Sequence, residues 1–305
     1  MIKAFILLSG VLFFAGCNSV LKEKQQLAYD ITNNKNFKLV KEEAKTIIGS
    51  GFTAGDGYGE IWIRDFNTFI ELSCDVLDRK TMREKLLVFF KFQGADGNII
   101  DAYIPKNKTT EGTYQYIYSE LEPDLAAHKN TVETDQESSL LQAVFKYIKK
   151  TDDKEILQEE ISGMKVFARM ERALEFLTNY RFNEKYGLIW GGTTADWGDV
   201  QPEHEWGVFL TETSHYSIDI YDNAMLVIAI KNFIDLVPES GLKWTPILKR
   251  FEISIRKYLW DQSRMKFRPH IYITDSPFPE NLKEDEIFYH GGTAVAIETI
   301  KLHIQ

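Results

Sequence analysis

Cysteine is scarce in this sequence. The 305 residues include only Cys17 and Cys74, which excludes a disulfide framework, and a metal site built from several thiolates is not expected. The histidines lack the paired or i, i+4 spacing that brings two imidazoles onto one ion. A glycine-rich phosphate loop and a nucleophilic serine elbow are also missing. We therefore expect no metal and no cofactor.

Positive charge is in short supply as well. Lys and Arg total 36 against 45 Asp and Glu, so the net charge is −9. A nucleic acid needs a dense basic footprint, and no run of Lys and Arg supplies one, so we expect no nucleic acid partner. Apolar residues at 44% and charged residues at 27% are ordinary values for a globular protein with a sizeable core.

Long apolar runs are missing except at the N-terminus. Residues 4–16, AFILLSGVLFFAG, follow Lys3, precede Cys17 and are too short to span a bilayer. The pattern resembles the signal of bacterial lipoproteins, which are cleaved before a cysteine that is then acylated; a plain secretory signal is the alternative. We predict a signal peptide at 1–16, lipidation of Cys17 and a tether at 17–36. This implies a lipid-anchored protein of the bacterial cell envelope, in the outer membrane or facing the periplasm.

Helical periodicity is what the sequence does contain. Eight segments have apolar residues at i, i+3, i+4 and i+7. They span residues 37–48, 64–77, 80–93, 135–149, 154–180, 218–236, 243–259 and 292–303. The connections between some of them are long and rich in aromatic residues and glycine, and loops of this size in a compact domain usually carry function.

Two segments, 176–190 and 256–270, resemble each other. Each ends a helix with aromatic residues, passes a polar turn and continues with alternating apolar residues, which predicts a helix followed by a small hairpin. Two unrelated aromatic loops are the alternative. Repeated helix pairs with functional loops at one end favour a mainly α protein, an (α/α) toroid over residues 37–305, with short β-hairpins in its loops.

Three clusters could carry chemistry, and the first is Trp62, Arg64 and Asp65. An acidic residue at a helix start has a structural explanation, because it favours the positive end of the helix. That explanation does not cover the three residues together. An aromatic ring can cover the apolar face of a sugar while a guanidinium and a carboxylate bind its hydroxyl groups.

The second and third clusters are TVETDQESSL (131–140) and GLIWGGTTADWGDVQPEHEW (187–206). In the second, helix capping by Thr134 or Asp135 is a sufficient explanation, and a ligand role for Asp135 is the alternative. In the third, Asp196 and Asp199 flank Trp197. Contact with an indole raises the pKa of a carboxylic acid and keeps a proton donor protonated. Asx-turns with the tryptophans plugged into the core are the alternative.

These motifs resemble those of the six-hairpin glycosidases. WIRDFNTFIEL (62–72) is similar to the Trp-x-Arg-Asp motif of the glucoamylases of glycoside hydrolase family 15, which implies that Arg64 and Asp65 hold the terminal sugar. The segment around Asp135 is similar to one in the glycogen-debranching amylo-α-1,6-glucosidases. TADWGDVQ resembles the segment that carries the general acid, which implies Asp199 as first choice and Asp196 as second.

The segment SIDIYDNAMLV (217–227) is similar to the helix that follows in these families, with its Asn-Ala pair at Asn223 and Ala224. Where debranching relatives have a glutamate, this chain has Tyr221, which puts the bond specificity in doubt. We expect Tyr221, Trp190 and Trp197 to contact the sugar.

The resemblance implies an (α/α)6 toroid that hydrolyses the terminal sugar of an oligo- or polysaccharide, α-glucosidic in the look-alikes, with inversion. Inversion needs an acid and a base. The candidates for the base are Glu298, Glu203 and Glu205, and none matches the late motif of these families. The chain also ends inside an apolar helix, so we expect an incomplete toroid. The alternatives are a carbohydrate-binding lipoprotein without turnover and a helical scaffold that binds protein.

Overall fold

The computed structural model describes residues 22–50, 59–110, 114–194, 201–202, 208–286 and 291–299. The chain forms two compact units, Met1–Gly51 and Phe52–Gln305. In the first unit, residues 22–33 are helical and α2 spans Lys35–Ser50. This division differs from the predicted boundary between tether and toroid at residues 36 and 37. None of the helices described is both long enough and apolar enough to cross a membrane.

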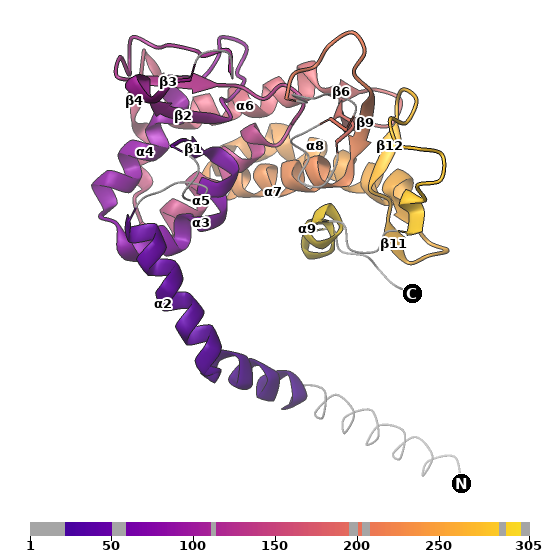
Figure 1. Ribbon diagram of the computed structural model, residues 1–305, viewed down its shortest axis with the longest axis horizontal. Coiled ribbons are helices and arrows are strands. Elements are labelled where there is room, and N and C mark those ends of the chain that lie inside the picture. The colour runs from indigo at the N-terminus through magenta and orange to yellow at the C-terminus, as the bar shows by residue number, and fades with distance from the viewer. Residues whose placement is uncertain are drawn as a thin grey trace. The chain divides into compact units, whose positions relative to one another are not determined.

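The second unit is built mainly of helices, with short strands between them (Figure 1). They are α3 (Ile63–Val76), α4 (Arg79–Lys91), α5 (Gln136–Thr151), α6 (Val166–Tyr180), α7 (Ile220–Leu236), α8 (Gly241–Ser254) and α9 (Gly291–Thr299). Helix α3 packs against α5, α5 against α7, and α7 against α9. Helices α4 and α6 each pack against the two helices that precede and follow them, and α8 packs against α7. The odd-numbered helices are therefore successive neighbours in one layer.

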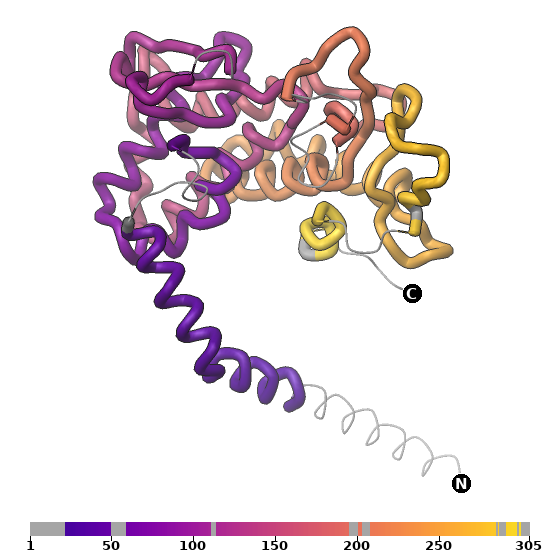
Figure 2. The backbone as a smooth tube through the Cα atoms, in the orientation of Figure 1, coloured from indigo at the N-terminus to yellow at the C-terminus, as the bar shows by residue number. Residues whose placement is uncertain are grey.

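Burial sets α5 and α7 apart from the other helices of this unit. Helix α5 is buried over its first nine residues, polar and apolar alike, and α7 is buried over most of its length. A helix that is buried on all sides lies inside a domain, whereas one with an apolar stripe covers it. Figure 2 shows α9, in yellow, beside α7 in orange, as their packing requires. Helices α5 and α7 thus form the core of the inner layer.

Short strands occupy the connections. One sheet has the order β1 (Ile61–Trp62), β2 (Ala102–Pro105), β3 (Leu125–His128), and another has β12 (His270–Tyr272), β9 (Tyr216–Asp219), β8 (Gly191–Gly192); all these pairs are antiparallel. Strand β1 leads directly into α3, and β9 leads directly into α7. The two sheets therefore fix the N-terminal ends of two inner helices.

The two predicted helix-hairpin segments are confirmed. After α6, β6 (Phe182–Asn183) pairs with β7 (Leu188–Ile189). After α8, whose last turn continues into a π-helix (Ile255–Leu259), β10 (Trp260–Asp261) pairs with β11 (Lys266–Phe267). The similarity between the two sequence segments therefore reflects a repeated structure.

The predicted helix over 154–180 is wrong in its first half. Residues Lys154–Gln158 form a 3-10 helix, and β4 (Glu160–Ile161) pairs with β5 (Met164–Lys165) before α6 begins at Val166. The two-residue turn of this hairpin has positive φ at Ser162 (49°) and Gly163 (77°). A Ser-Gly turn of this kind joins antiparallel strands and interrupts the helix.

Candidate functional site

The N-terminal ends of α3, α5 and α7 meet at a cluster of charged side chains. Arg64 lies in the first turn of α3, Asp135 is the N-cap of α5, and Tyr221 lies in the first turn of α7. The structure thus brings together three of the residues that the sequence predicts to bind a ligand. Because helix N-termini carry partial positive charge, this end of the inner layer favours acidic side chains.

Arg64 is the centre of the cluster. Its Nε donates to Asp135 Oδ2 at 2.9 Å and its Nη2 to Asp135 Oδ1 at 3.0 Å, while Nη2 also lies 2.9 Å from Glu133 Oε1. The Asp135 and Glu133 side chains are 1% and 4% exposed, whereas that of Arg64 is 15% exposed. Burial would lower the pKa of Arg64, but the two carboxylates outweigh it and raise the pKa. Arg64 is therefore held rigidly as a cation.

Asp135 does not act as a capping side chain, although it occupies the N-cap position. Its carboxylate accepts no capping hydrogen bond from a backbone N–H of α5. Besides Arg64, it accepts hydrogen bonds from the Tyr221 hydroxyl at 3.1 Å and the Ser139 hydroxyl at 3.5 Å. Burial, followed by the charge of Asp135, raises the pKa of Tyr221, so the phenol stays a neutral donor. Helix capping therefore fails as an explanation of the Asp135 side chain.

A third carboxyl, that of Asp222, adjoins this cluster. Thr134 Oγ1 makes a very short hydrogen bond to Asp222 Oδ2, and Asp222 lies in the first turn of α7. Burial, together with the charges of Asp219 and Asp135, raises the pKa of Asp222 well above its ordinary value. Asp222 thus favours its protonated, neutral form. This avoids three neighbouring buried negative charges on Asp135, Asp219 and Asp222.

Asp219 caps α7 and ties it to a distant strand. Its Oδ1 accepts hydrogen bonds from the backbone N–H of Tyr221 at 2.5 Å and of Asp222 at 3.0 Å. His270 on β12 places Nε2 3.2 Å from Asp219 Oδ2, and its Nδ1 is in close contact with Glu284 Oε1. Burial would lower the pKa of His270, but its hydrogen bonds to the two carboxylates, with their charges, raise it to about 10.

His270 is expected to make the stability of the protein depend on pH. Its folded pKa of about 10 lies above the unfolded value of roughly 6.5, so its contribution is complete below pH ~6.5 and is lost as the pH rises towards 10. The difference in thermal midpoint between wild type and His270→Gln should therefore be largest at acidic pH and shrink through this window. Differential scanning fluorimetry from pH 6 to pH 10 measures it, and a difference that grows with pH would contradict the assignment.

Trp62 lies beside the cluster as the N-cap of α3. Its half-buried ring packs edge-on against His128 at 5.0 Å and against Tyr114 at 6.4 Å, and the Tyr114 and His128 rings stack at 4.0 Å. Burial lowers the pKa of His128 to about 4, so this imidazole is neutral. Aromatic rings are thus packed together on the β1–β2–β3 sheet next to the first turn of α3.

The remaining predicted residues fall into two groups. Trp190 is half-buried, with Arg181 4.8 Å above its ring and Tyr216 packed edge-on at 5.2 Å, while Asp65 lies half-buried in the first turn of α3. The other predictions lie outside what the structure describes. These are the backbone and side chains of Cys17, Asp196, Trp197, Asp199, Glu203 and Glu205, and the side chain of Glu298.

Sequence reasoning missed Glu133, Asp222 and the Asp219–His270–Glu284 group. Glu133 stands in the quoted motif TVETDQ, two positions before Asp135, and Asp222 directly precedes Asn223. Acidic residues close to a predicted helix start were the available signal. The pairing of Asp219 with His270, 51 positions later, leaves no local signal in the sequence.

The side chains at this end of the inner layer are held in fixed positions by one another. They are the guanidinium of Arg64, the carboxylates of Asp135 and Glu133, and the phenol of Tyr221. The Arg64 guanidinium is the most exposed of the three charged groups and can donate strong, directional hydrogen bonds to a ligand with several hydroxyl groups, while the buried carboxylates hold it in place. Within the residues that the structure describes, no three His, Cys, Asp or Glu side chains are grouped to hold a metal ion.

No protein-family model and no curated protein sequence matches the chain. Among solved structures it is similar to the GH63 mannosylglycerate hydrolase from Thermus thermophilus. The complex with glucose has 14% identity and a TM-score of 0.53 over 75% of this chain and 66% of that chain. The complex with Tris has 15% identity and a TM-score of 0.52 over 74% and 66%. A rhamnosidase from Klebsiella oxytoca with rhamnose bound has 16% identity and a TM-score of 0.44 over 69% and 35%.

The two similarities with TM-scores above 0.5 show the fold. The chain has an (α/α)6 toroid fold, which confirms the predicted fold class. It spans 66% or less of the length of each of the three structures.

Proposed function

We propose that the chain binds the terminal sugar of a glycan at the N-terminal ends of α3, α5 and α7, as part of a glycoside hydrolase. One observation carries this proposal. The sequence predicts Arg64, Asp135 and Tyr221 as sugar-binding residues, and in the folded protein these three side chains are joined by hydrogen bonds. In this proposal Arg64 and Asp65 bind sugar hydroxyls, and Trp62, Trp190 and Trp197 supply apolar surfaces.

The reaction we propose is inverting hydrolysis. A carboxylic acid donates a proton to the glycosidic oxygen, and a carboxylate on the opposite face of the ring activates a water molecule. Asp199 is the proposed acid and Asp196 the second choice, on the resemblance to the general-acid segment of the glucoamylases and debranching enzymes. The same resemblance supports an α-glucosidic terminal sugar as the substrate. Glu298, Glu203 and Glu205 are the candidates for the base.

A panel of plant, host and storage glycans incubated with the purified protein tests this proposal. Both binding and released sugar should be recorded, because they separate two functions. Release of a single sugar from chain ends supports an exo-acting hydrolase. Binding without release would favour the carbohydrate-binding alternative, and neither binding nor release across the panel would contradict both.

We also propose that a lipid on Cys17 anchors the protein in the bacterial cell envelope. The Cys17→Ser variant should move from the detergent phase to the aqueous phase in detergent phase separation of cell lysates, because it lacks the acylated thiol. Cys74→Ser is the matched control and should stay in the detergent phase. Membrane association of Cys17→Ser at the wild-type level would refute the anchor.

A further inference from the structure

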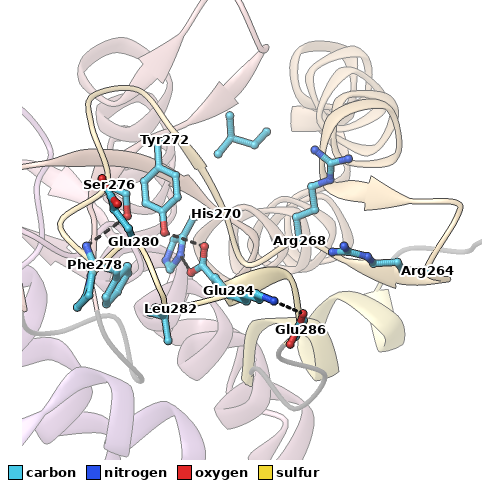
Figure 3. Close-up of a pocket in the computed structure, with 13 residues that line it drawn as sticks. Arg264, Arg268, His270, Tyr272, Ser276, Phe278, Glu280, Leu282, Glu284 and Glu286 are labelled. Atoms are coloured by element: carbon cyan, nitrogen blue, oxygen red, sulfur yellow. Dashed lines mark hydrogen bonds and ion pairs between the residues drawn. The ribbon is translucent and has the colours of Figure 1, made fainter.

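A cavity of about 790 Å³ lies between β12 and the segment that follows it (Figure 3). This volume is within the range of roughly 300–1,000 Å³ that small-molecule sites occupy. His270 and Tyr272 on β12 form one wall, and residues 276–286 form much of the rest. Among the residues that the structure describes, none that the sequence predicts to bind a sugar lines this cavity.

The lining combines aromatic rings with charges of both signs. The Tyr272 and Phe278 side chains lie on one side of the view and the Arg264 and Arg268 side chains on the other (Figure 3). The lining also includes Glu280, and no single sign of charge dominates. An anionic ligand would require an excess of positive charge, whereas a ring flanked by donors and acceptors suits a neutral sugar unit.

The cavity wall is built rigidly. Glu284 accepts a hydrogen bond from the Tyr272 hydroxyl at 2.7 Å and is also in contact with His270. The His270 side chain is 3% exposed and that of Glu284 17%. These contacts hold the segment around Glu284 against β12, so the cavity is formed in the absence of a ligand.

Buried hydrogen bonds and ion pairs link this wall to the cluster around Arg64. His270 contacts Asp219, Asp219 caps the turn that carries Tyr221, and the Tyr221 hydroxyl donates to Asp135. Every step of this chain is a hydrogen bond or an ion pair. The cavity therefore borders the N-terminal end of α7 on the side of β12.

We infer that this cavity is a second carbohydrate subsite, which binds a further neutral sugar unit of the glycan whose terminal sugar lies at Arg64. This inference rests on the proposed function and specifies its substrate: an oligosaccharide rather than a single sugar. Phe278 supplies the apolar platform and Arg264 and Arg268 supply donors to hydroxyl groups.

Titration calorimetry with the sugar found in the panel and with its neutral oligomers of two to six units tests the inference. Wild type should bind a longer oligomer about tenfold more tightly than the monosaccharide, because one additional sugar unit packs in the cavity. Phe278→Ala should lose most of this gain and keep the monosaccharide affinity. Phe278→Tyr, which keeps the ring, should behave as wild type, and Leu242→Ala, at a side chain 93% exposed on α8, is the neutral control.

The outcomes separate the subsite from the proposed function. If Phe278→Ala binds the longest oligomer as tightly as wild type, or weakens oligomer and monosaccharide equally, the subsite is refuted while the terminal sugar site stands. If wild type binds neither monosaccharide nor oligomer, the proposed function fails, and the subsite fails with it. A thermal midpoint of Phe278→Ala close to wild type shows that the variant is folded.

Discussion

Arg64→Lys is expected to abolish binding of the terminal sugar while the protein stays folded. Lysine keeps the positive charge that compensates Asp135 and Glu133, but it cannot reproduce the two parallel hydrogen bonds that fix the guanidinium. Calorimetric titration with the sugar found in the panel measures the loss, and thermal unfolding checks the fold. Wild-type affinity in Arg64→Lys would show that the cluster is structural.

Arg64→Ala is a harsher change. It leaves two carboxylates buried without their counterion, which should lower the free energy of unfolding by about 3–5 kcal/mol. For this reason the lysine variant, rather than the alanine variant, is the informative test of binding.

The chain offers a matched control for Arg64→Lys. Arg83 on α4 lies 3.2 Å from Asp153, a carboxylate whose side chain is 2% exposed. Asp153 follows the C-terminal end of the 16-residue helix α5, about 24 Å along the helix from Asp135. Arg83→Lys leaves Asp153 paired with Arg79 at 2.9 Å, so it should cost no more stability than Arg64→Lys, and it should leave sugar binding unchanged. Equal losses of binding in both variants would indicate a general effect on the fold.

Asp199→Asn is expected to lower kcat on natural glycosides by about 10²–10⁴-fold, because it removes the proton given to the leaving oxygen. Substrates with an activated leaving group need that proton less and should lose less. Asp196→Asn should have the smaller effect. Steady-state kinetics of both variants on the glycan identified in the panel makes the comparison, and full activity of both would refute the acid assignment.

The fold was largely predictable because its signals are local. Helical periodicity located the inner and outer helices, and the polar turns in 176–190 and 256–270 marked the hairpins after α6 and α8. The segment 154–165 was missed because its apolar residues keep a helical spacing while the Ser162-Gly163 turn, which decides the structure, is only two residues long.

The candidate site was predictable only in part, because its contacts join residues far apart in the chain. Asp135 satisfies the sequence rule for an N-cap equally well whether its side chain bonds to its own helix or to Arg64, 71 positions earlier. The sequence therefore left both alternatives open. Only the packing of α3 against α5 brings the guanidinium within reach and decides between them.

The most direct test of the central claim is a crystal structure of the protein with its sugar bound. The account predicts electron density for the terminal sugar at the N-terminal ends of α3, α5 and α7, with its hydroxyl groups within about 3 Å of the Arg64 guanidinium. Density for the sugar at another place, with the Arg64–Asp135 cluster unoccupied at saturating sugar concentration, would contradict it.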